Sequence, residues 1–174
     1  MSTKGHLTGI ETFFDKDEVI VTKTCLKGSI TYANRTFLRI SEYDENEIIG
    51  RQHNLIRHPD MPRCVFKLLW ARLQAQHEIF AYVVNRSKLG NHYWVLAHVT
   101  PSLNSERKVV GFHSSRRVPE RAPLEGTIIP LYHDLRQREQ QEADPKRGVE
   151  ASSDMLQAII QNKGVSYDQF IFSL

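Results

Sequence analysis

The densest group of chemically capable side chains lies in one irregular segment, residues 51–62. Guanidinium, imidazole and amide groups gather there, on Arg51, His53, Asn54, Arg57 and His58. Burying such groups costs free energy unless each meets a polar or anionic partner. A flavin dinucleotide meets that condition, since it combines a flat apolar ring, a polar ring edge and a pyrophosphate. A basic loop that stays in water and caps the following helix through Asp60 would not bear this cost at all. The residues alone therefore leave both interpretations open.

A second cluster follows in residues 83–95. Asn85 ends a predicted strand, where its amide can donate to and accept from the edge of a ligand. Tyr93 and Trp94 are neighbours on the next strand, so only one of them can face a pocket. Considered alone, Trp94 fits the hydrophobic core better than a cofactor site.

Alternating and helical patterns predict the elements that must position these side chains. Two strands come first, then short helices after Asn34 and Asp44, one longer amphipathic helix, and three more strands. The predicted strands cover 19–22, 30–32, 79–85, 92–101 and 109–117, and the longer helix covers 62–76. This order predicts an α+β fold with a five-stranded antiparallel sheet and helices packed on one face.

The sequence divides into three predicted parts: an N-terminal cap (1–17), a sensor domain (18–118) and a helical C-terminal extension (119–174). The cap carries apolar residues that we expect to pack on the domain, namely Ile10, Phe13 and Phe14. In the extension, Asp144 before Pro145 predicts a helix start. Ser166 with Gln169 forms a capping-box pattern before a last short helix.

Composition narrows the classes of function. The 174 residues carry a net charge of +3 that is spread along the chain, which argues against nucleic-acid binding. Cys25 and Cys64 cannot form a paired-ligand zinc site and are predicted to be free thiols in a reducing compartment. No apolar run approaches the ~20 residues that span a bilayer, and no signal peptide is visible. We therefore expect a cytoplasmic protein without a membrane span.

Three strings of residues carry a resemblance to a known family. The first is residues 30–37. The second runs from Gly50 through His53 and Asn54 to the Arg-His-Pro-Asp-Met-Pro run at 57–62, and the third from Asn85-Arg86 through Gly90 to the His-Tyr-Trp-Val run at 92–95. Over residues 18–117 the chain resembles the PAS domain of bacterial aerotaxis receptors. The resemblance implies a non-covalently bound FAD whose redox state follows respiration.

The resemblance also indicates site residues. It points to Asn34, Arg57, His58, Asp60 and Asn85 as residues that bind the flavin or shape its pocket. With neighbours in the same motifs, the predicted cofactor-binding set is Asn34, His53, Asn54, Arg57, His58, Asp60, Asn85 and Trp94. No catalytic residue and no metal ligand is predicted.

Two departures from the family stand out. Aerotaxis receptors carry a Trp just before the strand that ends in Asn85, and this chain has Ile79 and Phe80 there. The chain also lacks their membrane anchor and coiled-coil region, which indicates a stand-alone relative. We expect its output to pass through the C-terminal helices, because reduction would protonate the ring, alter its hydrogen bond to Asn85 and shift the sheet. A chemotaxis component or a kinase is the expected partner, and a homodimer the expected assembly.

Four alternatives remain open. A haem gas sensor needs an axial ligand, which His53 or His58 could supply from the loop, while the long helix offers only His77. A blue-light photoreceptor needs a cysteine where His53 stands. An enzyme is disfavoured because no catalytic triad, metalloprotease or phosphate-loop motif occurs. A cofactor-free PAS domain that serves only for dimerisation is the fourth.

Overall fold

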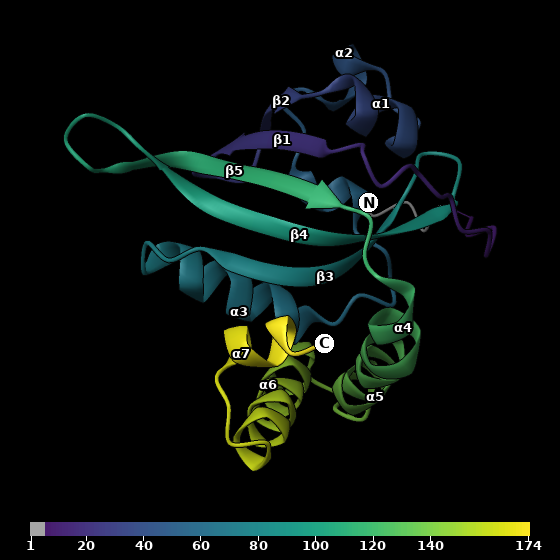
Figure 1. The fold of residues 1–174 in the computed structure, drawn as a ribbon, viewed down its shortest axis with the longest axis vertical. Coiled ribbons are helices and arrows are strands. Elements are labelled where there is room, and N and C mark those ends of the chain that lie inside the picture. Colours follow the sequence, from purple (N-terminus) through teal and green to yellow (C-terminus); the bar gives the residue numbers. More distant parts are fainter. Residues whose placement is uncertain (1–5) are drawn as a thin grey trace.

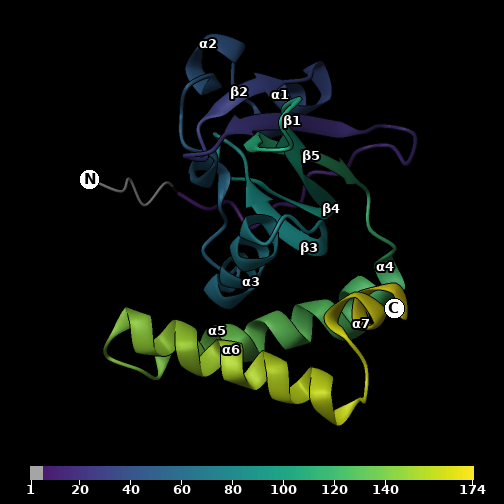
Figure 2. The ribbon, with the colours of Figure 1, turned by 90° about the vertical axis from the view of Figure 1, so that its left-hand side faces the viewer.

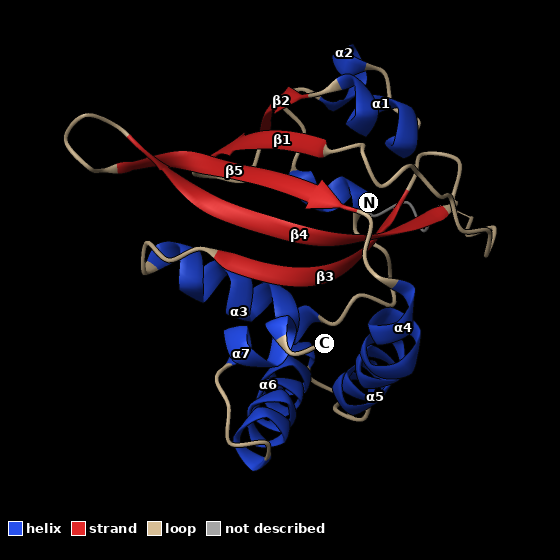
Figure 3. Cartoon of the chain, in the orientation of Figure 1, coloured by secondary structure: helices blue, strands red, loops and turns tan. Residues whose placement is uncertain are grey.

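A computed structural model describes residues 6–174; residues 1–5 of the predicted cap lie outside the described residues. Five strands form one antiparallel sheet in the order β2-β1-β5-β4-β3 (Figures 1 and 3). Their bounds are Ile20–Cys25 (β1), Ile30–Ala33 (β2), Ile79–Arg86 (β3), His92–Leu103 (β4) and Val109–Arg117 (β5). The predicted α+β class and five-stranded antiparallel sheet are confirmed.

Side-chain alternation along the strands decides which residues reach the interior. In β4, Tyr93, Val95 and Ala97 are buried, while the residues between them are only partly covered. Neighbouring strands extend the same inward face, because Asn85 pairs with Tyr93 and Arg116 pairs with Ala97. The inward face therefore brings polar side chains from β3 and β5 next to apolar ones from β4.

The first helices cover this inward face of the sheet. They are α1 (Arg35–Ser41), α2 (Glu45–Ile48), the 3-10 turn η1 (His53–Ile56) and α3 (Arg63–Gln74). In α3, Val65, Leu69 and Leu73 recur every four residues and are buried, which makes one apolar stripe toward the sheet. The helix is shorter than the predicted 62–76, because Pro62 is its cap and Gln76 takes a left-handed φ of 61° that ends it.

The C-terminal extension forms a further layer beyond α3. Its elements are α4 (Arg121–Pro123), the π-helical turn η2 (Leu124–Ile128), α5 (Ile129–Gln140), α6 (Pro145–Asn162) and α7 (Tyr167–Phe172). The antiparallel pair α5–α6 lies against α3, and α7 contacts the edge strand β3 (Figure 2). The predicted caps are present, since Asp144 accepts a hydrogen bond from the Lys146 backbone and Ser166 forms a capping box with Gln169.

The N-terminal segment differs from the prediction. Ile10 and Phe13 are 61% and 66% exposed, so they do not pack on the domain, whereas Phe14 does contact the core. Backbone hydrogen bonds hold the segment instead: Thr12 N donates to His92 O (2.7 Å) and His92 N donates to Ile10 O (2.9 Å). Because these hydrogen bonds join backbone atoms, they hold the segment in place without covering the side chains of Ile10 and Phe13.

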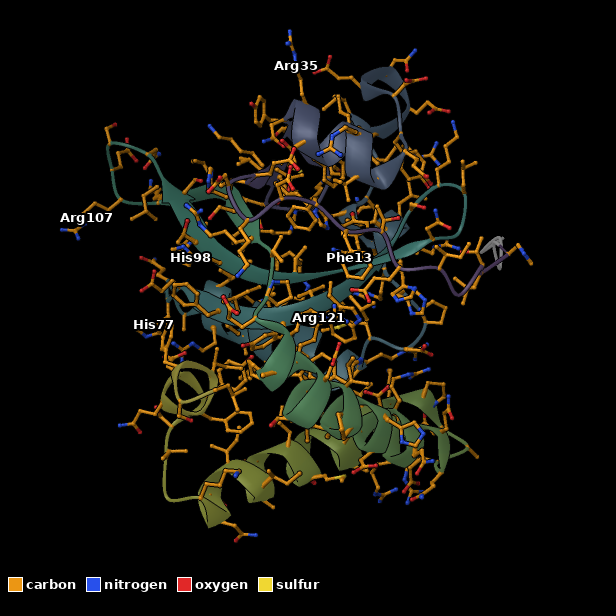
Figure 4. All side chains as sticks on the ribbon, turned by 45° about the vertical axis from the view of Figure 1, so that its right-hand side comes forward. Phe13, Arg35, His77, His98, Arg107 and Arg121 are labelled. Carbon is orange, nitrogen blue, oxygen red and sulfur yellow. The ribbon has the colours of Figure 1, made fainter. Side chains whose placement is uncertain are left out.

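The same segment is joined to the start of the C-terminal extension. The Arg121 guanidinium donates to the Glu11 carboxylate (2.7 Å) and lies 5.4 Å from the centre of the Phe13 ring (Figure 4). Among residues 6–174, no helix is both long and apolar enough to cross a membrane.

Candidate functional site

A cavity of about 260 Å³ lies between α3 and the inward face of the sheet. Two of its walls are apolar. One is formed by α3 and the other by the sheet, through Phe66, Leu69, Leu73, Val83, Ala97, Val99 and Phe112. Flat apolar walls of this kind suit a planar ring, because its faces make close contacts without a need for hydrogen bonds.

Arg116 provides the charge on the β5 side of the cavity. It is only 4% exposed, and its Nη2 donates to Thr22 Oγ1 (2.8 Å) and to His53 Nε2 (2.7 Å). Its Nη1 is buried without a hydrogen-bond partner, and no carboxylate of residues 6–174 forms an ion pair with it. Burial lowers the pKa of Arg116 to about 10, which leaves the guanidinium charged at neutral pH. The cavity is therefore electropositive at this end.

His53 is held as a neutral imidazole. Burial, followed by the charges of Arg116 and Arg57, lowers the pKa of His53 to about 3. A neutral ring can accept a hydrogen bond at Nε2, which is the atom that the Arg116 guanidinium contacts. His53 therefore orients Arg116 and adds no second positive charge.

Arg57 and Asn85 form the other polar end of the cavity. The Arg57 guanidinium lies 4.0 Å from the centre of the Phe66 ring, and the Arg57 backbone bridges to that of Asn85. Burial, together with the charge of Arg63, lowers the pKa of Arg57.

Arg57 Nε and Asn85 Nδ2 are buried without a partner, as is the Ser114 hydroxyl oxygen. All three residues line the cavity. Unpaired buried donors are costly, and a ligand with acceptor atoms in the cavity would offset that cost.

Four of the eight predicted site residues come together around the cavity: His53, Asn54, Arg57 and Asn85. Asn34 does not line it. The Asn34 carboxamide caps α1 by accepting from Phe37 N (3.0 Å). It also donates to the Val19 carbonyl, just before β1, and accepts from Val21 N in β1. It joins α1 to the first strand and so supports the site from a distance.

His58 and Asp60 lie in the loop beside the cavity and do not line it. His58 is buried next to His92, with ring centres 5.7 Å apart, and its Nδ1 accepts from Asp60 N (3.2 Å). The Asp60 side chain is exposed and does not cap α3. The first turn of α3 is capped instead by Glu139 of α5, which accepts from Cys64 N (3.1 Å).

Trp94 lies on the opposite face of the sheet from the cavity. Strand alternation turns Tyr93 inward, and Trp94 packs near Tyr132 of α5, with ring centres 6.0 Å apart. Its inclusion in the predicted cofactor set is therefore not supported by its position. Ile79 and Phe80, which stand where aerotaxis receptors carry a Trp, also lie outside the cavity lining: Ile79 is in the core and Phe80 stacks on His98.

The predicted site does not include the polar residues of β1 and β5, chiefly Thr22, Ser114 and Arg116. A signal was available, because Phe112, Ser114 and Arg116 alternate along one strand and must share a face. An arginine on the same face as a buried phenylalanine indicates a buried charge, and hence a site.

Comparison with known proteins identifies the family and the fold. The family described as PAS fold matches residues 30–116, half of the chain, and the chain belongs to this family. Solved structures of light-oxygen-voltage domains share the fold. One, studied with a flavin analogue, superposes on 71% of this chain and 88% of its own with a TM-score of 0.57 at 16% identity. The dark-state Aureochrome1 domain covers 70% of this chain and 84% of its own, with a TM-score of 0.54 at 21% identity.

Among curated relatives, the aerotaxis receptor of Escherichia coli (strain K12) is 38% identical over 135 residues. That match covers 78% of this chain and 26% of the receptor. Phototropin-1A of Oryza sativa subsp. japonica is 25% identical over 66% of this chain and 13% of its own length. The chain thus spans about a quarter or less of these relatives. It comprises a PAS domain, related to the aerotaxis receptor, and a helical extension.

Proposed function

We propose that this protein is a flavin-binding sensor that holds FAD in the cavity and reports redox state or oxygen to a signalling pathway linked to energy taxis. The observation that carries the proposal is the set of buried donors without partners, on Arg57, Asn85 and Arg116, between two apolar walls. The relationship to the aerotaxis receptor and to light-oxygen-voltage domains supports the same ligand class.

FAD would supply reversible uptake of electrons, and the chain's own residues would hold and tune it. The apolar walls exclude water from the ring. The Asn85 amide offers a hydrogen-bond donor at the ring edge, and Arg116 offers a fixed positive charge. Because His53 is neutral, it keeps Arg116 in place without competing for negative charge on the ligand.

The position of His53 favours flavin over haem. Its Nε2 accepts from Arg116 at 2.7 Å, so the lone pair that would ligate an iron is already in use. His58 lies outside the cavity lining, and His77 is exposed beyond the end of α3 (Figure 4). An axial ligand would therefore require breaking a buried hydrogen bond or moving the loop.

We further propose that output passes through the C-terminal helices to a partner in the cytoplasm, either a chemotaxis component or a kinase. In this proposal the protein acts as a homodimer and has no enzymatic activity. Two contacts support this route. Tyr132 of α5 donates to the Tyr82 carbonyl on β3 (2.6 Å), three residues from Asn85. Glu139 of α5 caps α3, which carries the Phe66 side of the cavity.

An absorption spectrum before and after dithionite tests the ligand. We expect a two-band flavin spectrum that bleaches on reduction, with FAD released on denaturation. Asn85→Ala and Arg57→Ala should each weaken FAD binding about ten-fold, the effect of losing one buried hydrogen bond. Asn162→Ala and Arg107→Ala, which change the same residue types at exposed positions, should leave binding unchanged. A Soret band, or a colourless protein that takes up no flavin, would overturn the proposal.

Limited proteolysis of the oxidised and reduced protein tests the route of output. We expect the cleavage rate within residues 119–174 to change on reduction, because docking of these helices would depend on the state of the cavity. Equal rates in both states would count against output through the extension while leaving flavin binding intact.

A further inference from the structure

A second hollow of about 420 Å³ adjoins the cavity on its open side. It is a surface groove between the β1–β2 turn, the C-terminal half of α3 and the start of β5. Its lining residues are Leu26, Lys27, Trp70, Leu73, Gln74, Val109 and Phe112. Four of them, Lys27, Trp70, Leu73 and Phe112, also line the cavity, so the two spaces lie side by side with these residues as a shared wall.

The size of the cavity requires an occupant that extends beyond it. About 260 Å³ lies just below the range of ~300–1,000 Å³ that is typical for ligand pockets. This space suits a planar ring system and leaves no room for a dinucleotide. The second half of such a ligand must therefore lie outside the cavity, and the groove is a hollow directly beside it.

The groove has the surface chemistry that a nucleotide needs. Trp70 is 36% exposed although its ring edge packs on Phe112, with centres 5.3 Å apart, and Leu26 is 56% exposed. An exposed aromatic ring between aliphatic side chains is a surface on which a base can stack. Lys27 stands between the two spaces, where a phosphate linker would pass, and no carboxylate of the described chain lines either space.

Gly28 lines the cavity beside this shared wall. It has a φ of +79°, and a Cβ there would lie 3.4 Å from Gln52 Oε1 and 3.9 Å from the Trp70 ring. Glycine therefore leaves the space next to Trp70 free of a side chain and also permits the left-handed backbone.

We propose that the groove formed by Leu26, Lys27, Trp70 and Gln74 binds the adenosine diphosphate half of the ligand, and that it makes the protein select a dinucleotide over a mononucleotide. This inference rests on the proposed flavin function. Trp70 stacks on the adenine, and Lys27 pairs with the phosphates.

Affinities of the ligand-free protein for FAD, FMN and riboflavin test the inference. We expect wild type to bind FAD at least ten-fold more tightly than FMN. Trp70→Ala should weaken FAD binding on the order of ten-fold, the usual effect of losing one stacked base, and should change FMN binding much less. Lys27→Gln should weaken FAD and FMN but not riboflavin, which lacks a phosphate.

Gln74→Glu provides the sharpest variant, because Gln74 lines the groove and not the cavity. The added carboxylate should repel the pyrophosphate and lower FAD affinity several-fold at low salt, with riboflavin binding unchanged. Gln161→Glu on α6 makes the same charge change at a distant exposed position and should have no effect.

The outcomes separate this inference from the proposed function. If wild type binds FAD, FMN and riboflavin equally, or if Gln74→Glu behaves like Gln161→Glu, the groove assignment is overturned and the flavin site stands. If Trp70→Ala leaves FAD affinity intact but dissociates a dimer, the groove is an interface between copies of the chain, and the assignment is again wrong. If wild type binds no flavin, both proposals fail.

Discussion

Arg116 beside the cavity and Glu139 on α5, where it contacts α3 and α6, are both buried charges, 4% and 6% exposed. Glu139 has a full set of partners within the chain. It accepts from Arg136 (2.5 Å), from the Ser152 hydroxyl and from the Cys64 backbone N–H (3.1 Å each). Arg116 has a hydroxyl and a neutral imidazole as partners, and one of its donors is unused.

The two charges differ in whether the protein itself supplies their partners, as it does for Glu139 and does only in part for Arg116. A buried charge whose hydrogen bonds and counter-charge are all present adds to the integrity of the fold. A buried charge with unused donors costs stability until another molecule supplies the missing acceptor. The Glu139 carboxylate therefore has its hydrogen bonds and its counter-charge within the protein, whereas Arg116 has no counter-charge and keeps a buried Nη1 that a ligand could engage.

Glu139→Ala should produce the largest loss of stability. It removes the cap of α3 and leaves Arg136 without its carboxylate, so we expect the free energy of unfolding to fall by about 3 kcal/mol. Urea denaturation measures this directly. Glu150→Ala, at an exposed position on α6, is the matched control and should change stability by less than about 0.5 kcal/mol. Equal effects of the two substitutions would show that the buried contacts of Glu139 do not stabilise the fold.

Arg116→Met should have effects of opposite sign on stability and on binding. Without ligand, removal of an uncompensated buried charge should raise the free energy of unfolding by about 1 kcal/mol. Flavin affinity should fall at least about ten-fold, because a charged hydrogen bond to the ligand is lost. Denaturation without ligand and titration with FAD measure the two effects. A variant that loses stability and keeps its affinity would show that Arg116 is a structural residue.

Acid should lower the free energy of unfolding, because protonation of His53 is unfavourable in the folded protein. The pKa of His53 is about 3 in the folded protein, below the ordinary value of 6.5, so the unfolded chain binds a proton more readily. Stability is therefore fully present above pH 6.5 and is lost as the pH falls from 6.5 toward 3, by at most about 1.4 kcal/mol per pH unit.

His53→Gln should flatten this pH dependence, which denaturation at a series of pH values would reveal. His133→Gln, an exposed change on α5, should keep the slope of wild type. If the slope were the same in all three proteins, the neutral state assigned to His53 would be wrong.

Tyr132→Phe should have the smallest effect. It removes only the hydroxyl that donates to Tyr82 O, at a cost of about 1 kcal/mol. Local opening of α5 should make residues 119–174 more sensitive to protease, while FAD affinity stays within about two-fold of wild type. Tyr32→Phe, at an exposed position, is the control. A large loss of FAD affinity would instead show that the cavity and the helical interface are strongly coupled.

Much of the fold could be predicted because it depends on local signals. Strand alternation located all five strands, and the caps at Asp144 and Ser166 located the last helices. The prediction was weakest for the ends of the chain. Ile10 and Phe13 are apolar and were expected to be covered, but backbone pairing with β4 holds them at the surface.

The site was predictable only in part, because local signals do not show which distant residues come together. Residues of one loop, such as His53 and Arg57, are close in sequence and were identified together. Asn34 and Trp94 belong to the same motifs but serve the fold, as a helix cap and as packing on the far face of the sheet. A motif shows which residues occur together, and it does not show which of them touch a ligand.

The sequence by itself determined the order of elements, the PAS resemblance and the polar loop, because each depends on residue types at short spacing. Only the tertiary structure decided that Arg116, 63 residues after His53, shares a hydrogen bond with it, and that Glu139 caps a helix 75 residues earlier. Whether a buried charge is satisfied depends on all the groups that folding brings around it, and those contacts are not encoded at any local spacing.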